Sequence, residues 1–368
     1  MKQLLPILFT LLVIRSHSQN RSTYLRDSTR INDSKKSSIT LYTNELEASN
    51  VSSNFPFANI VVEDVRFDTS YVAVGNIKLL FGGKGSFQKI NLTGGSANAL
   101  SKYLNGRISH HFALTKPTLV CYLKNLRLTQ EDSLNKKTKE VEVHNAMIFE
   151  IEGYLAKGEQ FFPATRLDTI AVAFTKKNNS FPLLEEVLDR FVSKVGLLDT
   201  GMVLRRSSYS AAQLDRRYQQ RFEKQILTSR SLTKGVYTSS TEFINNNPSI
   251  QEYQFEKDKK ATILYTRSNR HEWLPARTAF GFCDGHTIWI NVHNIFHPLV
   301  RQGNTFEFIA DINYANRRTS GSGVYIPAAG SVASIGASAL ISAATTSYEN
   351  YDSGKSVYQI DMETGEFY

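Results

Sequence analysis

Hydrophobic and polar residues alternate through much of the middle of the chain, which is the pattern expected of half-buried β-strands. The clearest alternation covers residues 141–151, where every second position is apolar except Asn145. A turn sequence around Gly158 follows, and residues 161–174 alternate again, so the two stretches predict a β-hairpin. Residues 118–128 predict a third strand.

Two stretches of the same region carry hydrophobic residues at helical spacing. Residues 96–106 place apolar side chains on one face, and we expect Ser96 to cap this helix. Residues 181–196 carry a longer apolar stripe. Strands combined with helices that return to one face of a sheet predict an α+β domain over residues 56–204, built as a mixed sheet with two packed helices.

The segment that follows is strongly basic. Apolar residues recur every four positions between Ser210 and Thr228, which predicts one continuous amphipathic helix there. We interpret residues 205–234 as a basic linking helix and residues 235–368 as a second, β-rich domain.

The second domain contains strand patterns separated by turn signals. Asp284-Gly285 and Thr364-Gly365 each predict a hairpin turn. Residues 328–346 are rich in alanine, serine and glycine and carry no charge, so we expect a helix that packs through small side chains. This helix is the predicted anchoring or self-association element. Packing against the protein's own sheet and a flexible segment are the alternatives.

The amino-terminal residues have the pattern of a secretory leader. Lys2 supplies a positive end, residues 4–14 supply an apolar run too short to span a bilayer, and small residues precede Gln19. The sequence therefore predicts a signal peptide over 1–18 and export to the periplasm or the outer cell surface. Residues 19–55 are polar and predict a poorly ordered arm.

Charge indicates the kind of partner. The formal net charge is +9, and it falls to +7 once cleavage removes Lys2 and Arg15. A positive exported protein favours anionic neighbours, so we expect an anionic envelope component or another envelope protein as partner. Peripheral membrane contact is one possible mode, whereas nucleic acid is not expected. For the basic segment itself we favour a solvated linking helix, because runs of charge usually face water, and contact with an anionic surface is the alternative. The predicted residues for an anionic surface are Arg216, Arg217, Arg221 and Lys224.

Three stretches of the second half carry a family resemblance. They are "KGVYTSSTEFINNNPSI", "GFCDGHTIWIN" and "YQIDMETGEFY". They resemble uncharacterised secreted proteins of Bacteroidetes bacteria. The resemblance implies secretion and supplies no catalytic or binding residues.

The tetrapeptide pattern Arg-apolar-Asp-Thr occurs twice, a hundred residues apart. Residues two apart on a strand share a face, so Arg66 with Asp68, and Arg166 with Asp168, each project one polar pair. If the two strands are neighbours, each arginine meets the aspartate of the other strand. We interpret these four residues as exposed structural ion pairs rather than a catalytic site.

A third Asp-Thr pair resembles the active-site turn of aspartic proteases. Asp199-Thr200-Gly201 has the required glycine, but it follows a helical pattern rather than a strand. The other two Asp-Thr pairs lack the glycine. We therefore interpret Asp199 and Gly201 as a helix exit.

Histidines and cysteines give weaker indications. His293 and His297 are four apart, with His286 and Asp284 nearby, which would suit a metal on a helix. No glutamate follows the first histidine, and the strand pattern before it argues against a helix, so we predict no metal and no cofactor. Both cysteines lie in apolar contexts and are expected to be buried free thiols, with a disulfide as the alternative.

Phosphate loops, dinucleotide fingerprints and nucleophile elbows do not occur in this sequence. The sequence as a whole predicts an exported, envelope-associated binding or assembly protein without catalytic activity. The alternative is a secreted hydrolase whose site is not visible in the sequence.

Overall fold

A computed structural model describes most of the chain, and the described residues belong to one compact unit within residues 32–368. The predicted signal peptide, most of the polar arm and the predicted helix 328–346 lie outside the described residues. The described ranges are 36–39, 55–77, 86–108, 116–135, 141–175, 181–257, 262–292, 294–311, 348–350 and 355–367.

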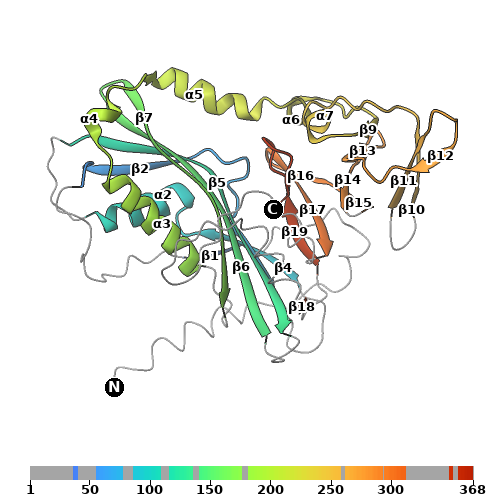
Figure 1. Cartoon of the computed structure of the whole chain (residues 1–368), viewed down its shortest axis with the longest axis horizontal. Helices are drawn as coiled ribbons and strands as arrows, with labels where there is room; N and C mark the ends of the chain where they lie inside the picture. The colour runs from blue at the N-terminus through green and yellow to red at the C-terminus, as the bar shows by residue number, and fades with distance from the viewer. Residues whose placement is uncertain are drawn as a thin grey trace. The chain divides into compact units, whose positions relative to one another are not determined.

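The largest element among these ranges is a nine-stranded mixed sheet (Figure 1). Its main path runs β1-β4-β3-β5-β6-β7-β8, and β2 and β18 also pair with β5. The strands are β1 Lys36–Ile39, β2 Asn59–Asp64, β3 Ala73–Ile77, β4 Ser86–Leu92, β5 Thr118–Asn135, β6 Val141–Lys157, β7 Gln160–Thr175, β8 Tyr209–Ser210 and β18 Tyr348–Asn350.

Three long antiparallel strands, β5, β6 and β7, form the centre of this sheet. The turn between β6 and β7 contains Gly158, whose φ of 60° is a left-handed conformation that glycine adopts without steric cost. This hairpin confirms the prediction from alternation. The predicted strand 118–128 is also present and continues to Asn135.

One face of the sheet is covered by α2 (Ser96–Arg107) and α3 (Phe181–Gly196) (Figure 1). Leu100 of α2 and Leu184 of α3 join Leu119 and Phe149 of the sheet in one buried cluster. The structure is therefore α+β, as predicted from the sequence. Ser96, however, does not cap α2: Gly95 occupies the cap position.

The opposite face of the sheet carries aromatic side chains that pack against α5 (Ala211–Gln219). Tyr122 of β5 stacks on Tyr218 of α5, with ring centroids 4.2 Å apart. Ser210 caps α5 through its side chain, and Gln213 completes a capping box. The chain reaches this helix from α3 through the short α4 (Thr200–Val203) and β8.

The prediction of one continuous helix from residue 210 to 228 is wrong beyond Gln219. The chain forms the 3₁₀ turn η1 (Gln220–Phe222), becomes extended at Lys224, and starts the short α6 (Gln225–Thr228). Tertiary contacts account for the break, because Phe222 packs edge-on against Phe67 at a centroid distance of 5.3 Å.

The remaining strands form three small sheets. A second buried cluster contains residues of two of these sheets and of α7 (Ser240–Ile244), and a third cluster packs Leu264 of the remaining sheet against Phe282 and Trp289. The turn at Asp284-Gly285 connects β13 to β14, and the turn at Thr364-Gly365 closes the C-terminal hairpin, so both turn predictions are confirmed. The sheets are β10 Tyr253–Lys257, β11 Thr262–Arg267 and β12 Trp273–Pro275; β15 Ile295–Pro298, β14 Ile288–Val292, β13 Gly281–Cys283 and β9 Gly235–Tyr237; and β16 Val300–Gln302, β17 Thr305–Asp311 and β19 Lys355–Gln359.

Both cysteines are free and buried, as expected. Cys121 belongs to the core under α2 and α3, whereas Cys283 belongs to the second cluster. Within the described ranges, no helix combines the length and the hydropathy that a membrane crossing requires.

Candidate functional site

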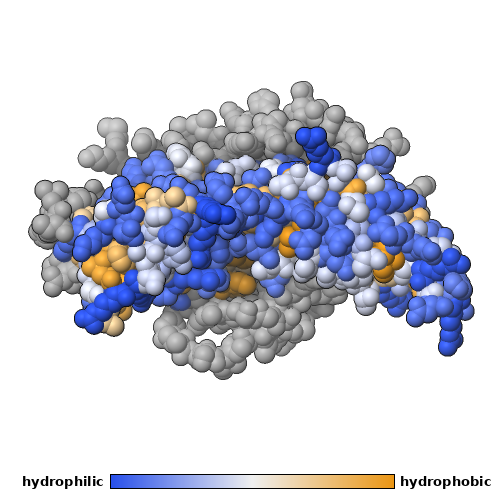
Figure 2. All heavy atoms as spheres, turned by 90° about the horizontal axis from the view of Figure 1, so that it is seen from above, coloured by the Kyte–Doolittle hydropathy of each residue, from blue (hydrophilic) through white to orange (hydrophobic). Residues whose placement is uncertain are grey.

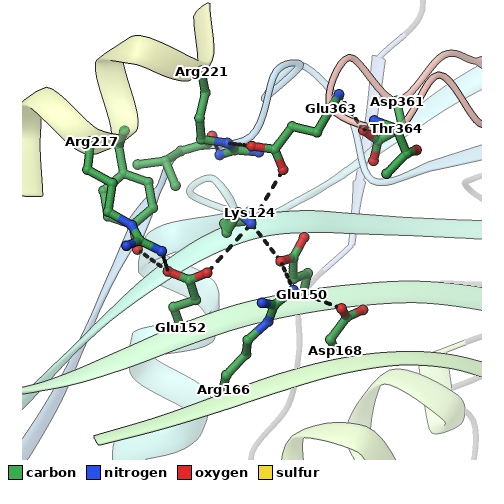
Figure 3. A network of polar contacts seen from close by, with 12 residues as sticks. Lys124, Glu150, Glu152, Arg166, Asp168, Arg217, Arg221, Asp361, Glu363 and Thr364 are labelled. Atoms are coloured by element: carbon green, nitrogen blue, oxygen red, sulfur yellow. Dashed lines mark hydrogen bonds and ion pairs between the residues drawn. The ribbon is translucent and has the colours of Figure 1, made fainter. Parts of the chain in front are cut away.

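Charged side chains converge on the sheet face opposite α2 and α3, around Lys124 (Figure 3). Lys124 sits at a β-bulge in β5, where an extra residue re-aims a side chain. Its ammonium nitrogen lies 2.6 Å from Glu150, 3.6 Å from Glu152 and 3.4 Å from Glu363. Burial opposes the charge, but the hydrogen bond to Glu150 and the nearby carboxylates outweigh it and raise the pKa of Lys124.

Glu152 of β6 is the most enclosed carboxylate of this group. It accepts hydrogen bonds from the hydroxyls of Tyr218 at 2.8 Å and Tyr154 at 3.1 Å, and Arg217 lies 3.4 Å away. Burial alone would raise the pKa of Glu152. The Tyr218 hydroxyl and the charges of Lys124 and Arg217 lower it, so this carboxylate is held in its ionised form.

Glu363 brings the C-terminal hairpin into the same group. Its carboxylate accepts from Arg221 at 2.7 Å, and Arg221 also donates to the Val65 carbonyl at 2.6 Å. Burial opposes ionisation, but Arg221 and Lys124 lower the pKa of Glu363. Asp361 accepts from the backbone N–H groups of the following turn, while its burial raises its pKa.

We call this group the Lys124 network. Four cationic side chains face four carboxylates, so their formal charges cancel. The network joins three parts of the chain: strands β5 to β7, the segment from α5 to η1, and the C-terminal hairpin. Its members are Lys124, Arg166, Arg217, Arg221, Glu150, Glu152, Asp168 and Glu363.

The first Arg-apolar-Asp-Thr motif lies just after β2 and is not an exposed pair. Arg66 is buried and donates to both carboxylate oxygens of Asp64, at 2.8 and 2.7 Å. It also donates to the buried hydroxyl of Ser96, the first residue of α2. Asp68 instead accepts from the Ser70 backbone N–H and from Gln359.

The second motif lies on β7 and has the expected exposure. Arg166 and Asp168 are 57% and 58% exposed and pair with each other at 3.0 Å. The prediction that each arginine meets the aspartate of the other motif is wrong. β2 pairs with β5, whereas β7 pairs with β6 and β8, so the two motifs do not lie on neighbouring strands. Arg166 instead reaches Glu150 across the β6–β7 ladder.

The Asp-Thr-Gly stretch is also placed differently from the prediction. Asp199 begins a helix rather than ending one: its side chain accepts from the backbone N–H groups of Gly201 and Met202 and caps α4. The carboxylate is therefore engaged in a helix cap, a role quite unlike that of a protease aspartate.

The four predicted anionic-surface residues do not share one exposed face. Arg217 pairs with Glu152, and Arg221 is 8% exposed and pairs with Glu363. Arg216 is exposed and Lys224 is half-buried. Half of the predicted patch therefore belongs to the Lys124 network: Arg217 of α5 reaches Glu152 while remaining 48% exposed, and Arg221 of η1 reaches Glu363.

The histidine and aspartate residues around the Asp284 turn do not form a metal cluster within the described ranges. Asp284 accepts from the backbone N–H groups of His286 and Thr287, so it stabilises the turn. His297 lies on β15 with its ring 6.1 Å from that of Phe308. His293 lies outside the described residues.

Sequence reasoning missed a second, deeply buried polar cluster. The Tyr71 hydroxyl donates to Glu307, Arg127 donates to Tyr71 at 2.5 Å, and Lys89 lies 3.4 Å from Glu307. Burial raises the pKa of Glu307, although Arg127 and Lys89 lower it in part. Glu307 lies between Phe306 and Phe308 on β17, so alternation alone places it on a polar, exposed face.

Searches for related proteins give no further guide to the site. No family model, no curated protein and no solved structure matches this chain.

Proposed function

We propose that this protein is an exported, envelope-associated binding or assembly protein without catalytic activity. One observation carries the proposal: in the Lys124 network, the charged groups compensate one another. A catalytic acid or base must be available to exchange a proton with a substrate. The lowered pKa values of Glu152 and Glu363 and the raised pKa of Lys124 instead favour permanent charges. Such a group of ion pairs holds the sheet, the segment from α5 to η1 and the C-terminal hairpin together.

Export rests on the amino-terminal pattern and on the resemblance to secreted proteins. Both are consistent with a periplasmic or outer-surface location. The positive charge of the chain favours an anionic envelope component, or an acidic surface of another envelope protein, as partner.

Expression with the native amino terminus in a bacterium that has an outer membrane tests the location. Cell fractionation should place the protein in the envelope or periplasm, and mass spectrometry should find Gln19 at the new terminus. Recovery in the cytoplasm with Met1 still present would contradict the proposal.

A hydrolase assay tests the absence of catalysis. The purified protein is assayed with chromogenic ester, peptide, glycoside and phosphate substrates, alongside Glu152→Gln and the exposed control Glu223→Gln. We expect no turnover by any of them. Turnover that Glu152→Gln abolishes and Glu223→Gln retains, in a variant with an unchanged circular dichroism spectrum, would show that the network is a hydrolase site instead.

A further inference from the structure

Two apolar side chains stand out from the surface where α3 is followed by α4: Leu197 lies in the connecting turn and Met202 lies in α4. Leu197 is 88% exposed and Met202 is 55% exposed, whereas Leu198, Val203 and Leu204 pack on the core of the sheet. The local structure explains this division. α3 ends at residue 196 and α4 begins at residue 200. In the segment from 197 to 204, one set of side chains packs on the core and the other faces solvent.

Single exposed apolar residues are common on protein surfaces and need no explanation. This site differs because Leu197 is almost fully exposed and a second exposed apolar side chain, Met202 of α4, follows five residues later. A side chain exposed to 88% stands clear of its neighbours, so the feature is convex and does not form a pocket. We call residues 197–202 the apolar tip.

Three exposed cations lie close in sequence to the apolar tip: Lys194, Arg205 and Arg206. Lys194 donates to the Arg166 carbonyl at 2.7 Å, and Arg206 donates to the Pro163 carbonyl at 2.8 Å. Both acceptors are neutral carbonyl groups, so these hydrogen bonds do not pair either cation with a carboxylate.

The neighbouring acidic groups cancel only part of this charge. Asp199 caps α4 by accepting from neutral N–H groups, so its formal negative charge remains, whereas Glu186 pairs with Arg190. The three cations against one carboxylate leave a formal charge of 3 − 1 = +2 around the tip. Figure 2 shows hydrophobic surface beside strongly hydrophilic surface on the side where Figure 1 places α4. We call Lys194, Arg205 and Arg206 the basic rim.

We propose that the apolar tip and the basic rim dock onto an anionic phospholipid surface. This inference deepens the proposed function by naming the partner of the envelope protein. Leu197 and Met202 enter the boundary between headgroups and acyl chains, while the basic rim is attracted to the lipid phosphates. A convex apolar feature with a basic rim suits a bilayer, which deforms around it. A protein partner would need a matching pocket.

Vesicle binding of the full chain tests the proposal. Co-sedimentation is measured with vesicles of phosphatidylcholine containing phosphatidylglycerol, and with phosphatidylcholine alone. We expect binding only to the anionic vesicles, weakened by added salt because salt screens charge. Leu197→Ser combined with Met202→Ser should weaken the binding about ten- to a hundredfold. Arg205→Gln should weaken it about fivefold.

Leu274→Ser is the matched control, because Leu274 is 49% exposed on β12, which belongs to a separate three-stranded sheet. Its vesicle affinity should equal that of the wild type. Equal weakening by Leu274→Ser and by the tip variants would overturn the proposal, as would full binding by the tip variants.

A fluorescent label gives a second readout that does not depend on affinity. Both native cysteines are buried, so an environment-sensitive dye on Leu197→Cys labels the apolar tip. Its emission should shift to shorter wavelength with anionic vesicles, and an unchanged spectrum would overturn the proposal.

Absence of vesicle binding by a protein that still fractionates with the envelope would overturn this inference alone. A cytoplasmic location would instead contradict the proposed function.

Discussion

The guanidinium of Arg221 donates to the carboxylate of Glu363 at 2.7 Å, across 142 positions of sequence. Arg221 is buried in the middle of the 3₁₀ turn that interrupts the linking segment, and Glu363 lies in the C-terminal hairpin. Lys124 of the large sheet contacts the second oxygen of the same carboxylate. This relationship fixes the hairpin to the sheet and to the linking segment at once.

Replacing Lys124, the central cation of the network, should weaken the attachment of the C-terminal hairpin to the sheet. Lys124→Met leaves the nearby carboxylates without their shared partner, and we expect a loss of about 2–4 kcal/mol in the free energy of unfolding. Chemical denaturation measures the loss, and hydrogen exchange should show reduced protection of residues 355–367. Lys102→Met, at an exposed position of α2, is the control and should change stability by less than about 0.5 kcal/mol.

The Glu363 contribution should depend on pH with a defined sign. Burial opposes ionisation, but Arg221 and Lys124 lower the pKa of Glu363 from its usual value of 4.5. A lowered folded pKa gives stability that is present above the unfolded value and is lost as the pH falls through the folded pKa. The stability difference between the wild type and Glu363→Gln should therefore be largest above pH 4.5 and shrink below it.

Denaturation curves at a series of pH values measure this difference. Glu223→Gln, at an exposed position of the linking segment, is the control and should show a small difference throughout. A Glu363→Gln difference that grows as the pH falls would contradict the assignment of Glu363 to a stabilising ion pair.

The two Arg-apolar-Asp-Thr motifs should respond very differently to loss of the paired carboxylate. Asp64→Asn removes the charge that faces the buried Arg66, and we expect a loss of about 2–4 kcal/mol in the free energy of unfolding. Asp168→Asn acts on a pair whose members are both more than half exposed, so the loss should be about 1 kcal/mol or less. Thermal or chemical unfolding of both variants makes the comparison. Similar losses would show that burial of Arg66 has no energetic consequence.

Both cysteines should resist thiol reagents in the folded protein. Burial raises the pKa of the Cys121 and Cys283 thiols, so the reactive thiolate is disfavoured as well as inaccessible. A thiol-reactive chromophore should detect no thiol under native conditions and both thiols after denaturation. A protein that shows none after denaturation would contain a disulfide, which contradicts the free cysteines of the structure.

Local patterns in the sequence predicted the parts of the fold that local interactions determine. Alternation predicted the β6–β7 hairpin and β5, and the apolar stripe predicted α3. The linking helix was predicted too long because Phe222 and Arg221 follow tertiary partners, Phe67 and Glu363, rather than the helical period.

The polar sites could not be predicted in the same way. Tyr71 and Glu307 are 236 positions apart, and alternation makes Glu307 look like a solvent-facing strand residue. Arg66 looks equally ordinary until the fold places Asp64 and Ser96 around it. Periodicity shows on which face a residue lies, but it does not show what packs against that face.

A double-mutant cycle on Arg221 and Glu363 tests most directly whether the Lys124 network is a structural joint. The free energy of unfolding is measured for the wild type, Arg221→Met, Glu363→Met and the double variant. We predict that the two changes are not additive and that the coupling energy is about 1–3 kcal/mol, as for residues in one ion-pair network. Additive effects, with no coupling beyond experimental error, would contradict the account.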